Sequence, residues 1–268
     1  MKALHRFSIA FAAATSSLAL AAAPSHAIVG GTDAPAGAYP SIVEVTLAKS
    51  FLCTGTLVAP DWVLTAGHCG SITGAAIATP IAFPGVLIDV SIGSNKSGAG
   101  ESVPVSYATI PPAYLATQGH DITLLKLSRP STLTPTKVAG ASETAAWAAG
   151  TVGTIVGWGA TSEGGDTPDT LQHAQVPVTT DAFCGGAYSN FEVSTMLCAG
   201  YPEGGIDTCQ GDSGGPLYGT TAAGERRVVG ATSFGEGCAR PGKPGVYARV
   251  GDTELRDWIR SVAPAAVS

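Results

Sequence analysis

Short apolar runs separated by turn residues dominate the hydrophobic pattern of this chain. Their β-branched and aliphatic residues, with partial alternation of apolar and polar positions, are typical of β-strands. The runs cover residues 41–47, 56–58, 62–65, 87–92, 122–127, 151–156, 175–178 and 227–232. Many short strands joined by turns predict an all-β protein.

A helical period appears at the end of the chain. Leu255, Trp258, Ile259 and Val262 stand at positions i, i+3, i+4 and i+7, which places them on one face of a helix. Asp252 or Thr253 is suited to cap its first turn. The pattern therefore predicts a C-terminal α-helix over residues 252–262 that docks on the sheet structure.

The composition supports short strands and argues against several kinds of partner. Charged residues make up only 13% of the chain, which contains 35 Gly and 18 Pro, so turns are frequent. No apolar run beyond the N-terminal region reaches the length of a membrane-spanning helix. Residues 28–268 carry 12 basic and 20 acidic residues, a formal charge of −8. This acidic balance argues against binding to nucleic acid or to an anionic membrane.

Residues 1–27 have the pattern of a secretory signal peptide. Lys2 and Arg6 give a basic start, and an apolar, Ala-rich segment follows from Phe7 to Ala23. We therefore expect a secreted, extracellular protein.

The end of this segment allows two ways of releasing the domain that follows. Ser25 and Ala27 are small residues at the two positions that signal peptidase reads, so that enzyme is expected to free Ile28 directly. The alternative is cleavage near Ala22 or Ala23, which leaves a short propeptide for a second protease.

Six cysteines follow the signal peptide. An even number of cysteines in a secreted chain predicts disulfide bonds. Spacing alone leaves open all of the roughly 15 connectivities that six cysteines allow. Zinc binding is a poor alternative, because the cysteines are dispersed and form no CxxC pair.

The stretch 207–216, with the sequence DTCQGDSGGP, is the strongest chemical signal. It places Ser213 among Gly211, Gly214 and Gly215. Glycines permit a tight backbone turn, in which the Gly211 and Ser213 N–H groups converge on one point as an oxyanion hole. A serine hydroxyl is a poor nucleophile at neutral pH, so it also needs a base.

Two further blocks supply that base and its partner. His68 lies in TAGHC (65–69), just past a predicted strand, and Asp121 opens the apolar run 121–127. An imidazole removes the proton from a serine hydroxyl, and a buried carboxylate holds that imidazole in the correct tautomer. The candidate catalytic residues are therefore His68, Asp121 and Ser213. His120 has no motif around it and is interpreted as a surface residue.

These blocks resemble those of the trypsin-like (chymotrypsin-fold) serine proteases, closest in pattern to the bacterial and fungal trypsins. The resemblance also includes IVGG (28–31), and it extends from Ile28 to about Ile259. It implies two packed six-stranded antiparallel β-barrels with a C-terminal α-helix. The peptidase domain would cover residues 28–268, with the N-terminal barrel at about 28–130 and the C-terminal barrel and helix at about 131–262.

The resemblance also implies the disulfide pairing and two supporting contacts. The implied disulfides are Cys53–Cys69, Cys184–Cys198 and Cys209–Cys238. A free Ile28 amine would pair with Asp212 and order the oxyanion loop. Ser233 would form a second hydrogen bond at Asp121. No metal and no cofactor are expected.

The substrate pocket is interpreted residue by residue from the same resemblance. Asp207 stands six positions before Ser213, where trypsin-like members place a carboxylate at the base of the pocket. Gly235 and Gly245 match the two wall positions that must be small. A buried carboxylate favours a basic side chain and penalises an apolar one. Cleavage after Arg or Lys is therefore expected.

The expected partners are protein and peptide substrates and protein protease inhibitors. The protein is expected to be a monomer. Two alternatives remain open at this point. One is an enzyme with chymotrypsin-like or elastase-like preference, against which Asp207 argues. The other is a non-catalytic binding homologue, because a fold by itself does not prove activity.

Overall fold

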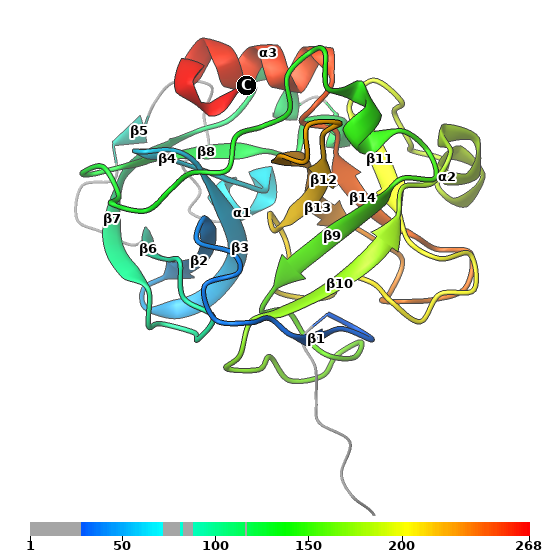
Figure 1. The fold of residues 1–268 in the computed structure, drawn as a ribbon, viewed down its shortest axis with the longest axis horizontal. Helices are drawn as coiled ribbons and strands as arrows, with labels where there is room; N and C mark the ends of the chain where they lie inside the picture. Colours follow the sequence, from blue (N-terminus) through cyan, green and yellow to red (C-terminus); the bar gives the residue numbers. More distant parts are fainter. Residues whose placement is uncertain (1–27, 72–80, 83–87, 116) are drawn as a thin grey trace, which may run out of the picture.

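The computed structural model describes residues 28–71, 81–82, 88–115 and 117–268, so the predicted signal peptide lies outside the described residues. Two antiparallel β-sheets stand side by side, one formed mainly by each half of the chain (Figure 1). An α-helix near the C-terminus covers one end of the pair. These features confirm the predicted all-β fold with a C-terminal helix.

The N-terminal sheet has the strand order β5-β7-β6-β2-β3-β4-β8, and an additional pairing between β7 and β8 closes six of these strands into a barrel. Its strands are β2 (Ile42–Leu47), β3 (Ser50–Ala59), β4 (Trp62–Thr65), β5 (Ile81–Ala82), β6 (Ile88–Ile92), β7 (Glu101–Thr109) and β8 (Thr123–Leu127). Alternate side chains point inward along β6, where Ile88, Val90 and Ile92 are each 1% exposed.

The C-terminal sheet has the order β1-β10-β9-β12-β13-β14-β11. Its strands are β1 (Thr32–Asp33), β9 (Val152–Gly157), β10 (Gln172–Pro177), β11 (Met196–Ala199), β12 (Pro216–Thr220), β13 (Arg226–Phe234) and β14 (Gly245–Ala248). A single antiparallel bridge between Val178 and Ala199 brings the end of β10 back beside β11. The β1 pairing joins the start of the described chain to this second sheet.

Helices are few in the described part of the chain. They are α1 (Gly67–Ser71), α2 (Asp181–Ala187) and α3 (Thr253–Val262), with 3₁₀ turns η1 (Pro112–Leu115), η2 (Gln118–His120), η3 (Thr144–Trp147) and η4 (Pro264–Ala266). None of the helices described here is both long and apolar enough to cross a membrane.

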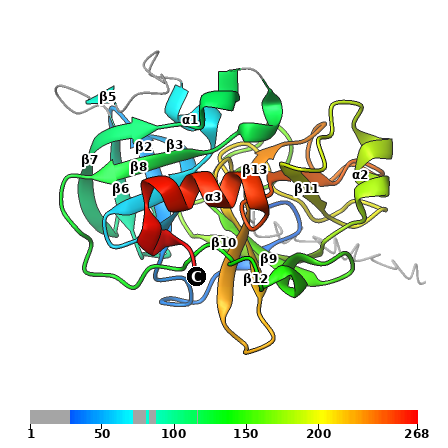
Figure 2. The same ribbon diagram turned by 90° about the horizontal axis from the view of Figure 1, so that it is seen from above.

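Helix α3 begins where the sequence predicts and packs across both sheets. The Asp252 carboxylate accepts a hydrogen bond from the Thr253 N–H group and so caps the first turn. Leu255 and Ile259 are fully buried, in one cluster with Ile122 of the N-terminal half and Val228 of β13. Figure 2 shows α3 lying across the junction between the sheets.

Three disulfides are present, and they follow the pairing that the resemblance implies: Cys53–Cys69, Cys184–Cys198 and Cys209–Cys238. The first joins β3 to α1, the short helix that carries His68.

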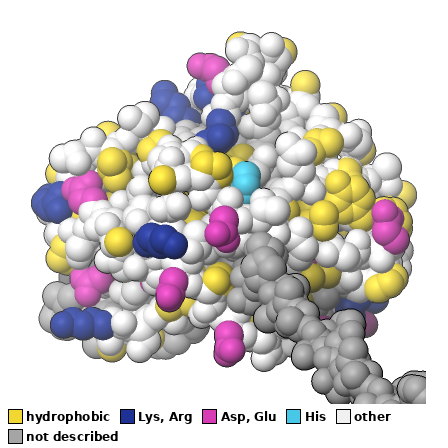
Figure 3. All heavy atoms as spheres, turned by 60° about the horizontal axis from the view of Figure 1, so that its bottom comes forward, with side chains coloured by type: hydrophobic (Ala, Val, Ile, Leu, Met, Phe, Trp, Pro, Cys, Tyr) yellow, Lys and Arg dark blue, Asp and Glu magenta, His cyan; other side chains and the backbone are white. Residues whose placement is uncertain are grey.

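On the face seen in Figure 3, basic and acidic side chains are scattered rather than gathered into a basic patch.

Candidate active site

His68 and Asp121 lie in direct contact, although 53 positions separate them in the sequence. The His68 backbone N–H donates to Asp121 Oδ1 at 2.9 Å, and the ring Nδ1 lies 2.9 Å from Oδ2. Burial alone would lower the pKa of His68. The hydrogen bond and the charge of Asp121 outweigh it, so the pKa is raised above its ordinary value. This arrangement suits an imidazole that must accept a proton.

Asp121 receives a further contact from the opposite sheet. The Ser233 hydroxyl, near the end of β13, donates to Asp121 Oδ2 at 2.5 Å. Asp121 is only 7% exposed. The carboxylate therefore lies at the interface of the two sheets, held from both sides.

Ser213 lies in the turn that precedes β12, between two glycines with positive φ. Gly211 has φ 100° and Gly214 has φ 77°, conformations that side chains with a Cβ rarely adopt. The Ser213 carbonyl accepts a hydrogen bond from Thr54 N at 3.0 Å. The sulfur of Cys69, the residue after His68, lies 3.8 Å from the same carbonyl oxygen. These contacts hold the serine turn against the segment that carries the histidine.

Two hollows lie beside the candidate catalytic residues and share Ser233 and Phe234 in their linings. One of about 610 Å³ is lined by His68, Asp121 and Ser233, together with Tyr114, Thr117, Gln118 and Phe234. The other, of about 160 Å³, lies between segments 208–213 and 232–238 and has Ser213, Thr208 and Gly235 in its lining. The candidate nucleophile and the candidate base therefore both face open space, which a substrate needs to reach them.

Asp207 is buried next to the smaller hollow, with 4% of its surface exposed. Its carboxylate accepts hydrogen bonds from Thr208 N at 2.8 Å and from Ala239 N at 3.0 Å. A Cβ on Gly245 would lie 2.6 Å from Asp207 Oδ1, so the close approach of this backbone to the carboxylate requires glycine at position 245. Burial outweighs the hydrogen bonds and raises the pKa of Asp207 to about 6.

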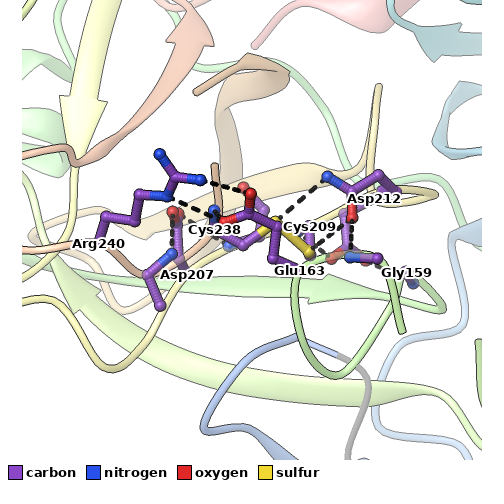
Figure 4. The surroundings of a disulfide bond; sticks show 11 residues. Gly159, Glu163, Asp207, Cys209, Asp212, Cys238 and Arg240 are labelled. Atoms are coloured by element: carbon purple, nitrogen blue, oxygen red, sulfur yellow. Dashed lines mark hydrogen bonds and ion pairs between the residues drawn. A yellow bond between two sulfur atoms is a disulfide. The ribbon is translucent and has the colours of Figure 1, made fainter. Parts of the chain in front are cut away.

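Asp212 is completely buried on the other side of the Cys209–Cys238 disulfide from Asp207 (Figure 4). Its carboxylate accepts hydrogen bonds from Gly159 N at 2.8 Å and from Cys209 N at 2.9 Å. Burial raises its pKa to about 7. The nitrogen of Ile28 belongs to the peptide bond with residue 27 in this chain, so the predicted pairing of an Ile28 amine with Asp212 stays a prediction.

Several contacts escaped the sequence patterns. Gly159 is required beside Asp212, because a Cβ there would lie 2.5 Å from Oδ2. The Tyr247 hydroxyl faces Gly245, and burial, together with the charge of Asp207, raises the pKa of this phenol well above its ordinary value.

One interpretation of an individual residue was wrong, and one ion pair was not anticipated. His120, expected at the surface, is 6% exposed and lies beside the catalytic aspartate candidate. Glu163 forms an ion pair with Arg240 and accepts a hydrogen bond from Cys238 N (Figure 4), a contact that the sequence did not indicate. In both cases the burial or the ion pair depends on a segment that is distant in the sequence.

The histidine–aspartate pair lies between two antiparallel β-sheets, one of them closed into a barrel, and the segment that carries the histidine contacts a serine in a glycine-rich turn. These features are those of a chymotrypsin-fold serine endopeptidase. Comparison with known proteins specifies the family. Residues 28–259 match the family described as Trypsin. The chain is 44% identical over 230 residues to "Trypsin" from Saccharopolyspora erythraea, covering 84% of this chain and 93% of that protein.

Two other relatives agree. "Trypsin-1" from Astacus astacus is 40% identical over 246 residues, covering 88% of this chain and 100% of the relative. "Trypsin-like protease" from Streptomyces glaucescens is 39% identical over 267 residues, covering 95% and 92%. The chain belongs to the trypsin family of serine endopeptidases, which confirms the resemblance and the enzyme class.

Proposed function

We propose that this protein is a secreted endopeptidase that cleaves peptide bonds after Arg or Lys. Residues 1–27 act as the signal peptide, and residues 28–268 form the peptidase domain. Protein and peptide substrates follow from the family. We further propose that the enzyme is a monomer, that protein protease inhibitors bind it, and that it acts without a nucleic acid or membrane partner.

The proposed mechanism is acyl transfer through His68, Asp121 and Ser213. Ser213 attacks the scissile carbonyl while His68 takes its proton, and the N–H groups of Gly211 and Ser213 stabilise the oxyanion. Asp121 holds the imidazole through Nδ1 and stabilises the imidazolium that forms. His68 then protonates the leaving amine, and water releases the acyl group by the reverse proton transfers.

The proposed preference for Arg and Lys depends on the buried carboxylate of Asp207. Its carboxylate is buried, and its hydrogen bonds to Thr208 and Ala239 come from neutral backbone donors. Ionising such a group without a cation is costly, which is why its pKa is raised. A guanidinium or ammonium in front of Gly245 would supply the missing charge, whereas an apolar side chain would leave the carboxylate unpaired.

Asp212 supports the proposed activation by a free Ile28 amine. The carboxylate is fully buried, and a carboxylate with this burial is ionised at little cost only when a cation pairs with it. Ile28 is also fully buried and has φ 60°, a conformation that β-branched residues rarely adopt. Cleavage before Ile28 would abolish that backbone constraint and create the α-ammonium.

This pairing predicts different pH dependence for two forms of an inactive Ser213→Ala protein, one beginning at Ile28 and one retaining residues 26–27. In the longer form the pKa of Asp212 is raised from 3.8 to about 7 in the folded state. The folded state therefore holds more protons than the unfolded state, and the free energy of unfolding falls as pH rises across that window. The loss should be on the order of a few kcal/mol. The form beginning at Ile28 should lose less.

Melting temperatures between pH 4.5 and 7.5 test this prediction. Asp207 also has a raised pKa, but it is present in both forms and cancels in the comparison. Equal pH slopes for the two forms would refute an Ile28–Asp212 ion pair.

The function as a whole is tested with peptide reporters that carry Arg, Lys, Phe, Leu or Ala before the cleaved bond. Turnover confined to Arg and Lys supports the proposal. Turnover of Phe or Leu would replace it with chymotrypsin-like preference. If no reporter is cleaved, a fluorophosphonate probe shows whether the active-site serine is inactive or the panel lacks a suitable substrate. The probe labels an activated serine and does not need to fill the substrate pocket.

A further inference from the structure

Asp121 sits at the apex of an inverse γ-turn. Its backbone angles are φ −74° and ψ 63°, and the Ile122 N–H donates to the His120 carbonyl at 2.7 Å. These values match the inverse γ-turn, in which the hydrogen bond closes over a single residue. The direction of the Asp121 side chain therefore depends on how the two flanking residues are held.

One end of this turn is fixed by the hydrophobic core. Ile122 is fully buried and packs in the cluster that includes Leu255 of α3. Residues 123–127 then continue as β8, paired with β4 and β7. This end has no freedom to reorient without disrupting the sheet.

The other end is fixed by the side chain of His120. Its Nδ1 lies 2.8 Å from Thr117 Oγ1, and its Nε2 lies 2.7 Å from Glu254 Oε1 in the first turn of α3. Both ring nitrogens are thus engaged, and the histidine is 6% exposed. Glu254 is accessible, with 54% of its side chain exposed.

The turn η2 is also pressed against the C-terminal half of the chain. Gln118 Oε1 accepts a hydrogen bond from Asn190 Nδ2 at 2.6 Å. A Cβ on Gly119 would collide with the Thr195 hydroxyl and lie 2.5 Å from Glu192 Oε2. These contacts limit movement of η2 toward that side, while the contact with Glu254 ties it to α3.

We infer that His120, held by Glu254, is a positioning residue for catalysis: it anchors the γ-turn that aims Asp121 at His68. His120 touches neither the substrate nor the reacting atoms, and it acts through Asp121. The inference rests on the proposed role of Asp121 in the triad.

A shift of the γ-turn would affect catalysis because both carboxylate oxygens of Asp121 contact His68. The backbone N–H of His68 lies 2.9 Å from Oδ1, and its ring Nδ1 lies 2.9 Å from Oδ2. A small rotation of the γ-turn lengthens both contacts together. Because misplacement by about 1 Å can cost roughly 100-fold in rate, we expect about a tenfold loss for a partial displacement. The ground-state fit of substrate should change little.

The experiment compares His120→Ala, Glu254→Ala and Glu254→Gln in the mature enzyme. We expect kcat for an Arg substrate to fall about tenfold in both alanine variants, with KM nearly unchanged. The acid limb of kcat/KM should move to lower pH, because a weakened Asp121 contact raises the pKa of His68 less. Glu254→Gln keeps an oxygen acceptor for His120 and should retain most of the activity.

Asp257→Ala is the matched control. Asp257 lies on the same helix, and its side chain is 54% exposed, as is that of Glu254. This control loses ion pairs with Arg256 and Arg260, so it reports what destabilising α3 does by itself. It should leave kcat and the acid limb unchanged.

Three outcomes overturn the inference. A lower melting temperature in Glu254→Ala with kcat and the acid limb unchanged would show a purely structural role. An Asp257→Ala variant that matches Glu254→Ala in kcat and acid limb would assign the effect to the helix. An Asp121→Asn variant with full activity would refute the catalytic role of Asp121, and the inference would fail with it. If Asp121→Asn is inactive while Glu254→Ala keeps normal kcat, as in the first outcome, the triad stands and only the positioning role of His120 is refuted. Glu254→Ala keeps the test decisive if His120→Ala does not fold.

Discussion

Replacing Ser213 with alanine should lower kcat by about 10⁶-fold while the protein stays folded. Without the hydroxyl no acyl-enzyme forms, and the remaining oxyanion donors and substrate contacts accelerate only direct attack by water. The turn should survive, because Ser213 is held through its backbone carbonyl, which accepts a hydrogen bond from Thr54 N at 3.0 Å. KM for an Arg substrate should therefore change little.

Burst kinetics and labelling by a fluorophosphonate measure this effect, with Ser97→Ala as the control for loss of a serine hydroxyl elsewhere. Ser97 lies between β6 and β7, where its hydroxyl donates to Glu44. The control should keep both the burst and the label. Residual turnover above about one part in 10⁴ in Ser213→Ala would contradict the assignment of the nucleophile.

Replacing Asp207 with serine should reduce kcat/KM for Arg and Lys substrates by on the order of 10⁴-fold. The variant removes the buried carboxylate that a basic side chain would neutralise, so a cation in the pocket would have no partner. His68, Asp121 and Ser213 are untouched, and labelling by the fluorophosphonate should persist. Turnover of Phe or Leu substrates should rise relative to Arg.

The raised pKa of Asp207 adds a second signature of the same pocket. Its pKa is about 6, so the carboxylate becomes neutral as pH falls below that value. In the wild-type enzyme KM for a basic substrate should rise below about pH 6, and KM for a neutral ester should not. Asp166→Ser, on the exposed loop 161–166, is the matched control and should preserve the preference for Arg and Lys. An unchanged preference in Asp207→Ser would refute the pocket assignment.

Apolar periodicity was sufficient to predict β2, β4, β6, β8, β9 and β13, parts of β3 and β10, and the C-terminal helix with its apolar stripe. It did not predict the short strands β1, β5, β11 and β14, nor the longer β7 and β12. The sequence of β7, ESVPVSYAT, contains a proline and several polar residues, and its strand conformation depends on pairing with β6 and β8. In β12 a register shift between Leu217 and Tyr218 accompanies an irregular pairing with β13.

The sequence by itself determined which residue types are available for catalysis and in what local setting. Glycines around Ser213 and the histidine and aspartate at strand boundaries are local features, and motif spacing detects them. The disulfide pairing and the pocket residues came from the resemblance to the family, because spacing alone does not choose partners.

Tertiary structure decided which distant groups meet and which are removed from water. The contact of His68 with Asp121, the burial of Asp207 and Asp212, and the link from His120 to Glu254 each join segments far apart in the chain. The packing of two sheets and one helix sets the shifted pKa values of His68, Asp207 and Asp212, because burial and nearby partners decide the energy of a charge.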